Sequence, residues 1–182
     1  MRRIISIQGN EYTKGGFEKK WSEVVNNTEC NYFVKDKDKE FLDSVKEEAL
    51  VLIEDHFKEV YPAREVYDLE MDWDTYAKLE DLSMLKIFTA RDGSTLVGYL
   101  WVIVSPNIHS KGNYTACDDG LFVSKECRGA SVAKDLIRFT EKCLKEDGLK
   151  VFHIVGTAEK PIDALMKRMG YSAVETKFQK VL

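Results

Sequence analysis

A strand, a loop of small residues and an amphipathic helix follow one another at residues 121–144, and this unit constrains the fold more than any other part of the chain. The strand ends with the apolar run Leu121-Phe122-Val123. Apolar residues then recur at helical spacing from Val132 to Leu144. Side chains are small where the helix begins, so an anion could approach its unpaired amides and the positive end of its dipole. The unit predicts a crossover connection with an anion site at its turn.

From residue 85 onward, apolar runs and turn residues predict an alternation of strands and helices. The dipeptide Asp92-Gly93 predicts a hairpin turn between the first two strands. Gly148 and Gly170 are typical helix-ending residues. We expect strands at 85–90, 96–104, 114–123, 151–155 and 172–181, and helices at 132–146 and 161–169.

The first half of the chain has weaker patterns. Two amphipathic helices are expected at 41–56 and 72–82. The mixed-charge run at 35–40 indicates a solvated linker or the start of a helix. We therefore predict an N-terminal extension at 1–40 and one domain at 41–182.

Composition excludes several classes of protein. The 27 Lys and Arg residues are outnumbered by 31 Asp and Glu residues, and a formal net charge of −4 argues against a nucleic-acid-binding surface. No apolar run approaches the roughly 18 residues of a membrane span, and no signal peptide is recognisable, so we expect a cytoplasmic protein without membrane partners. The cysteines lack C-x-x-C spacing and neighbouring histidines, which predicts free thiols and no metal site; they are Cys30, Cys117, Cys127 and Cys143.

The loop resembles the pyrophosphate-binding pattern Q/R-x-x-G-x-G/A of the GNAT N-acetyltransferases. Arg128 fills its first position and Ala133 its last, while Ser131 replaces the central glycine. The order of strands and helices in the C-terminal half is also similar to that of the family. The resemblance implies the α/β (α+β) GNAT acyl-CoA N-acyltransferase fold, a mixed, mostly antiparallel sheet flanked by helices. The alternative is an ordinary strand-to-helix connection in which Ser131 caps the helix.

In the GNAT fold, two parallel strands splay apart, and the pantetheine arm of the cofactor pairs with the freed backbone of the first. By resemblance, these strands end near Val123 and Val155. The expected cofactor is acetyl-CoA, and the residues that the resemblance implies for its binding are Leu121, Phe122, Val123, Arg128, Gly129, Ala130, Ser131, Val132, Ala133 and Lys134.

Amide formation requires a neutral amine, so a group must accept a proton from the ammonium form of the acceptor. Asp118 and Asp119 precede the loop and should face opposite sides of their strand. Asp119 matches the acidic position of related sequences and is predicted to be catalytic; the alternative is a contact with loop backbone or a cation. His109, in the preceding loop, is the second predicted catalytic residue because histidine titrates near neutral pH. His153 is interpreted as structural, and His56 has no catalytic context.

The function implied is transfer of an acetyl group to a primary amine on a small molecule or a protein. The sequence differs from the family pattern at a second position. Met166 occupies the place of a tyrosine that protonates the leaving thiolate in many members. The alternative is therefore a GNAT fold with eroded chemistry and a structural or partner-binding role. Strings such as V-G-Y-L and M-G-Y are similar to those of small bacteriophage and bacterial acetyltransferase-like proteins. A homodimer, or a virion or host protein, would then be the partner.

Overall fold

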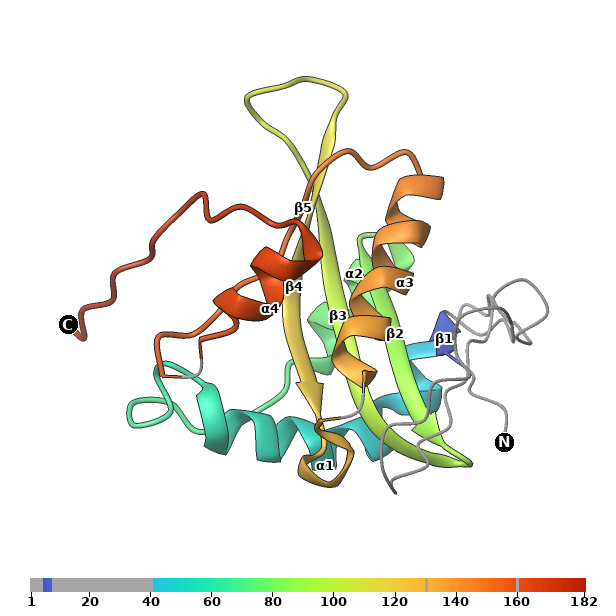
Figure 1. The fold of residues 1–182 in the computed structure, drawn as a ribbon, viewed down its shortest axis with the longest axis vertical. Coiled ribbons are helices and arrows are strands. Elements are labelled where there is room, and N and C mark those ends of the chain that lie inside the picture. The colour runs from blue at the N-terminus through green and yellow to red at the C-terminus, as the bar shows by residue number, and fades with distance from the viewer. Residues whose placement is uncertain (1–4, 8–40, 130, 160) are drawn as a thin grey trace.

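The computed structural model describes residues 5–7, 41–129, 131–159 and 161–182. Antiparallel strands, a crossover helix, a parallel strand and a further helix follow in the predicted order, which confirms the fold class (Figure 1). The elements are β1 (Ile5–Ile7), α1 (Phe41–Val60), α2 (Trp73–Asp81), β2 (Leu85–Asp92), β3 (Thr95–Pro106), β4 (Tyr114–Val123), the 3-10 turn η2 (Lys125–Cys127), α3 (Val132–Glu146), β5 (Phe152–His153) and α4 (Asp163–Met169).

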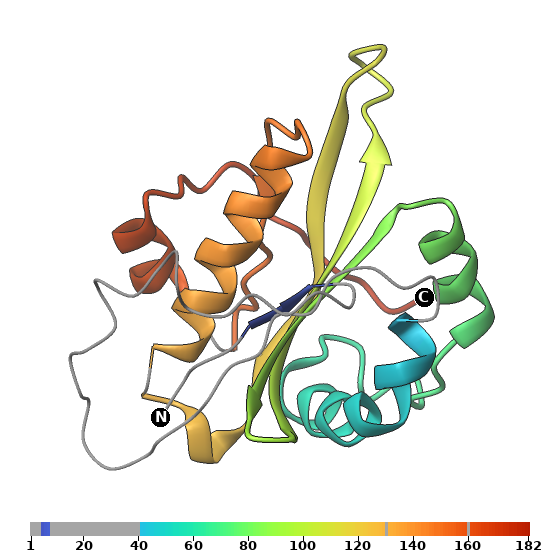
Figure 2. The same cartoon turned by 90° about the vertical axis from the view of Figure 1, so that its right-hand side faces the viewer.

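The described strands form one sheet in the order β1-β2-β3-β4-β5. The first three pairings are antiparallel, and β4 pairs with β5 in parallel. The predicted turn at Asp92-Gly93 joins β2 to β3, and Gly93 has a φ of 60°, which glycine adopts without strain. Helices α1 and α2 cover one face of the sheet, and α3 and α4 cover the other (Figure 2). The sheet therefore separates an α1/α2 side from an α3/α4 side.

Strand β3 is buried on both faces, as its nearly continuous apolar sequence requires. Leu100 and Val102 pack on the α3 side with Leu136 of α3. Tyr99 and Trp101 pack on the α1 side with the apolar face of α1. Alternation along one strand thus builds both halves of the core.

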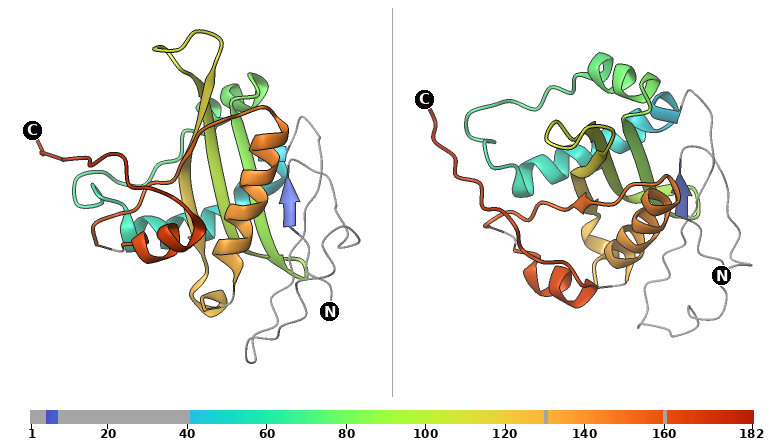
Figure 3. Two further views of the ribbon diagram at one scale, coloured as in Figure 1. Left: turned by 45° about the horizontal axis from the view of Figure 1, so that its top comes forward. Right: turned by 90° about the horizontal axis from the view of Figure 1, so that it is seen from above.

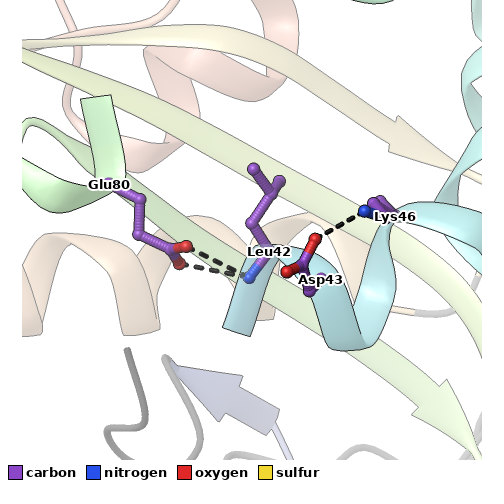
Figure 4. A network of polar contacts seen from close by, with 4 residues as sticks. All are labelled: Leu42, Asp43, Lys46 and Glu80. Carbon is purple, nitrogen blue, oxygen red and sulfur yellow. Dashed lines mark hydrogen bonds and ion pairs between the residues drawn. The ribbon is translucent and has the colours of Figure 1, made fainter. Parts of the chain in front are cut away.

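Polar side chains fix the helix ends on the α1/α2 side. Asp72 caps α2, since its Oδ1 accepts from the Thr75 amide at 3.0 Å. Glu80, near the end of α2, accepts from the Leu42 amide in the first turn of α1 at 3.1 Å, while Asp43 pairs with Lys46 on the same helix (Figure 4). Burial raises the pKa of Glu80. The contact from Glu80 satisfies an otherwise unpaired amide and joins the two helices.

The predicted strand at 172–181 is wrong, because residues 172–182 contain no strand, and Figure 3 shows this segment leaving α4 without joining the sheet. The predicted strand at 151–155 is reduced to the two residues of β5, and Val155 is 44% exposed. A strand requires a paired neighbour, and β5 offers little backbone for pairing. Apolar residues of the segment, among them Phe178, consequently stay exposed.

Within the predicted extension, β1 pairs with β2. The remaining residues up to 40 lie outside the described part of the chain, so the boundary at residue 40 stays a prediction. Among the described residues, none of the helices combines the length and the apolar character needed to cross a membrane.

Candidate active site

The parallel strands β4 and β5 separate soon after they meet. They pair only through Ala116 with Phe152 and Cys117 with His153. β4 continues as far as Val123, and in the described part of the chain no further residue of β5 pairs with it. The predicted splay is therefore present, and the end of β4 has an edge that no neighbouring strand covers.

Main-chain groups at the end of β4 point alternately toward β3 and toward this open edge. The Ser124 amide donates to the Val97 carbonyl at 2.9 Å, so residue 124 faces β3. Strand alternation then turns the N–H and C=O groups of Val123 and Leu121 to the open edge. An extended ligand can pair with these groups as a strand would, and at the Val123 carbonyl it would share the acceptor with Arg128 Nε.

Asp119 is the extra residue of a β-bulge. The register of β4 against β3 shifts between Trp101 and Val102, which leaves Asp119 without an opposite residue. Its exposed carboxylate reaches the α1/α2 side, where the Tyr76 hydroxyl of α2 donates to Oδ2 at 2.5 Å. Burial and the charge of Asp119 raise the pKa of Tyr76, so the phenol remains a hydrogen-bond donor. The bulge thus directs a carboxylate to the side of the sheet that carries α1 and α2.

Asp118 ends the pairing of β4 with β5. Its Oδ1 accepts a hydrogen bond from the Val155 amide at 2.8 Å, in the place where a main-chain carbonyl of β4 would continue the ladder. Burial raises the pKa of Asp118 to about 6, although the Val155 amide opposes this effect. Asp118 and Asp119 therefore point in different directions, as predicted: Asp118 contacts Val155 beside β5, and Asp119 contacts Tyr76 of α2.

Asp118→Asn should stabilise the fold by about 1–2 kcal/mol at pH 8 and have little effect near pH 4. The asparagine oxygen can keep the bond from Val155 without the charge that burial disfavours. Because the pKa of about 6 lies above the ordinary 3.8, the folded chain binds this proton more tightly than the unfolded chain. Wild-type stability therefore falls as pH rises between these values. Urea unfolding at both pH values measures the difference, and an equal effect at pH 4 and pH 8 would contradict the prediction.

The loop before α3 has the backbone that an anion site needs. Gly129 has a φ of 86°, and a side chain there would meet nothing within 4 Å. Ser131 occupies the predicted N-cap position, but its hydroxyl donates to the buried Asp135 carboxylate instead of accepting from an amide. Ser131 therefore makes no capping hydrogen bond to the first turn of α3. An anion could bind the amides that Ser131 leaves uncapped, while Ala130 lies outside the described residues.

Arg128 is engaged with α1. Its two Nη atoms donate to the Glu59 carboxylate at 2.7 and 2.9 Å, and its Nε donates to the Val123 carbonyl at 2.9 Å. The guanidinium also lies over the Phe122 ring, 5.1 Å from its centre. The residue predicted to bind the diphosphate thus ties the loop both to the end of β4 and to α1.

His56, for which the sequence indicates no catalytic context, lies against β4. Its Nδ1 is 2.7 Å from the Tyr99 hydroxyl oxygen, and its ring stacks on Phe122 with centres 5.1 Å apart. Gly120 makes this approach possible, since a Cβ there would lie 3.3 Å from Cε1 of His56. Burial, helped by Arg128, lowers the pKa of His56 to about 4, and Glu59 opposes this effect. The imidazole is therefore neutral at physiological pH.

His109 lies at the other end of β4. It belongs to the loop that joins β3 to Tyr114, and its amide donates to Asn107 Oδ1 at 3.0 Å. This hairpin projects beyond the rest of the sheet (Figure 1). The structure brings Asp119, but not His109, close to the open end of β4.

The sequence profile of the acetyltransferase (GNAT) family matches residues 47–171. This chain belongs to the GNAT acetyltransferase family. Members use acetyl-CoA and act on amine acceptors. No curated protein matches the sequence of this GNAT.

Solved structures share the fold of this GNAT at low sequence identity. An aminoglycoside acetyltransferase from an uncultured soil metagenomic sample, solved with sisomicin, is 18% identical with a TM-score of 0.60, covering 80% of this chain and 93% of its own. The ribosomal-protein-alanine N-acetyltransferase of Brucella melitensis biovar Abortus 2308 is 18% identical with a TM-score of 0.56, covering 76% and 94%. A Clostridium acetobutylicum protein described as a predicted acetyltransferase, solved with acetyl-CoA, is 11% identical with a TM-score of 0.55, covering 80% and 92%.

The described residues of this GNAT fit acetyl-CoA. The open edge at Leu121 and Val123 offers main-chain partners to an extended arm, and the uncapped first turn of α3 offers amides to a diphosphate. Met166, in the place of the family's tyrosine, is buried in the core beside α3 and has no proton to donate.

Proposed function

We propose that this GNAT transfers an acetyl group from acetyl-CoA to a primary amine. One observation carries the proposal: the open edge of β4 at Leu121 and Val123 leads through a short loop to the uncapped start of α3. An extended arm and the diphosphate attached to it would meet matching main-chain groups in that order. The family match supports the donor and the amine acceptor in general terms.

The binding residues would divide into three groups. Main-chain groups of Leu121 and Val123 would pair with the pantetheine arm, and the buried Phe122 ring between them would support this edge from the α1/α2 side. Amides of the loop and of the first turn of α3 would hold the diphosphate, with positive charge from Arg128 and Lys134. Together these are the residues predicted from the sequence, namely Leu121, Phe122, Val123, Arg128, Gly129, Ala130, Ser131, Val132, Ala133 and Lys134. Bound acetyl-CoA would supply the activated thioester.

Asp119 would act on the acceptor. Its carboxylate is exposed on the α1/α2 side and is held by the Tyr76 hydroxyl, so it can bind a cationic amine and assist loss of its proton. The same role for His109 stays a prediction, and the variant His109→Gln tests it in the assay below.

Asp119→Asn should lower kcat/KM by about 10²–10⁴-fold and leave the Kd for acetyl-CoA unchanged. Calorimetry gives the Kd, and a thiol-detection assay measures CoA release with a panel of amines. The panel begins with an aminoglycoside and a peptide with N-terminal alanine, because structural neighbours are described with such acceptors. Asp147→Asn is the control, since Asp147 pairs with Lys86 and follows the opposite end of α3. Equal losses in both variants would contradict the role of Asp119.

The second candidate is a GNAT fold that binds a partner instead of catalysing transfer. Ser131, Met166 and the engagement of Arg128 by Glu59 favour it. The partner would be a second copy or, for a bacteriophage protein, a virion or host component. Absence of acetyl-CoA binding at millimolar concentration would reject the transferase and support this role, whereas micromolar binding would support the transferase.

A further inference from the structure

His56 lies half-buried between α1 and the open end of β4, and the function proposed above does not use it. Three titratable or charged groups surround its ring. They are Glu59 on the same helix, Arg128 from the loop before α3, and Tyr99 from β3. The position of His56 beside Gly120 places it on the α1/α2 side, the same side of the sheet as Asp119.

The Arg128–Glu59 pair joins the loop predicted to bind diphosphate to the helix that carries His56. The Glu59 side chain is 12% exposed and the Arg128 side chain 39% exposed. The carboxylate is therefore fixed within the fold, whereas the guanidinium remains accessible to a second anion. A diphosphate at the start of α3 would compete with Glu59 for the same donors.

We propose that Arg128 is shared between two partners: it leaves Glu59 for the diphosphate of acetyl-CoA, and this exchange prepares His56 to take the proton of the acceptor amine. The inference rests on the proposed function. The exchange of Arg128 would make His56 basic enough to deprotonate the acceptor amine only after acetyl-CoA is bound.

Electrostatics give the direction of this coupling. Burial is the main reason why the pKa of His56 falls to about 4; the positive charge of Arg128 lowers it further, and Glu59 raises it. Departure of Arg128 removes one of the groups that lower the pKa and leaves the charge of Glu59 beside the ring. The pKa of His56 then rises toward neutrality, which makes the imidazole a stronger base.

The hydrogen bond to Tyr99 can select the basic nitrogen. Burial raises the pKa of Tyr99, so its phenol stays neutral. When Nδ1–H donates to the Tyr99 oxygen, Nε2 keeps its lone pair. The ammonium of the acceptor loses one proton to Nε2, giving a neutral amine and an imidazolium next to Glu59. Nitrogen-15 shifts of the ring identify this tautomer.

NMR titration of the imidazole in the full chain, with and without saturating CoA, tests the exchange. CoA should raise the pKa of His56 by at least about one, a tenfold change in proton affinity. Arg128→Gln should produce a similar rise without CoA. Glu59→Gln should lower the pKa of His56 both with and without CoA, because it removes the charge that raises this pKa.

Calorimetry with CoA on the same samples separates the possible failures. Absence of CoA binding overturns the proposed function, and the inference falls with it. CoA binding with an unchanged His56 titration overturns the inference alone. Glu59→Gln should also bind CoA several-fold more tightly, because Arg128 no longer has to leave a carboxylate; weaker binding would refute the exchange even if Arg128→Gln does not fold.

The proton transfer has its own test once an acceptor is known. His56→Gln should lower kcat at least tenfold, remove the acidic limb of the pH profile and leave the Kd for CoA unchanged. An unchanged pH profile would exclude His56 as the proton acceptor.

Discussion

Gly129→Asp is expected to weaken acetyl-CoA binding by about 100-fold, whereas Gly129→Asn should weaken it by less than about threefold. Gly129 has a φ of 86°, a conformation that aspartate and asparagine both tolerate better than other side chains. A side chain at this position meets nothing within 4 Å, so neither variant clashes, and both place a non-glycine residue at the same positive φ. They differ mainly in one negative charge, which would stand beside the diphosphate.

Calorimetry at low salt and at 0.5 M salt measures this effect. The gap between the two variants should shrink at high salt, because ions screen an exposed charge. Urea unfolding of both proteins is the control for backbone strain and should give similar free energies. Equal loss of affinity in Gly129→Asp and Gly129→Asn would mean that strain, and not charge, governs the loop.

Trp101→Ala should lower the free energy of unfolding by about 3–5 kcal/mol. The Trp101 side chain is 2% exposed, and its ring contacts those of Tyr76 and Tyr99 at centre distances of 5.3 and 5.8 Å. Removal of the indole leaves a cavity between the sheet and α2. Trp73→Ala is the matched control on the same cluster and should cost only about 1–2 kcal/mol, because Trp73 is half-buried.

Trp101→Phe separates ring volume from hydrogen bonding. Nε1 of Trp101 has no hydrogen-bond partner among the described residues, so the change to phenylalanine reduces the packed volume without removing a hydrogen bond. We expect a cost of about 1–2 kcal/mol from urea unfolding. If Trp101→Ala lowers the free energy of unfolding by less than about 2 kcal/mol, the contacts of Trp101 with Tyr76 and Tyr99 are not essential to the core.

Local patterns were sufficient to predict the central elements. β4 has the predicted bounds, Tyr114–Val123, and α3 has the predicted bounds, Val132–Glu146. Apolar residues at strand or helix spacing mark both elements, and Gly148, with a φ of 82°, marks the end of α3. The same patterns place the loop at the open end of β4, because both features depend on residues that are neighbours in the sequence.

Features that depend on distant residues were missed. The Arg128–Glu59 pair joins positions 69 residues apart, and no local spacing announces it. The sequence indicates no catalytic context for His56, because the surroundings of this residue exist only once α1 packs on β4. The alternation at 172–181 suggested a strand, but alternation cannot supply the neighbouring backbone that a strand requires. Gly120 leaves the space that the His56 ring occupies, but a glycine in the sequence does not reveal which side chain fills that space.

The contact between Asp118 and Val155 has a consequence for binding. A side chain, and not the arrival of a ligand, ends the ladder between β4 and β5 after two residue pairs. The splay between β4 and β5 is consequently present before a ligand binds. Binding of acetyl-CoA therefore does not have to break hydrogen bonds between β4 and β5, so its affinity should depend on the contacts that it makes and not on rearrangement of the sheet.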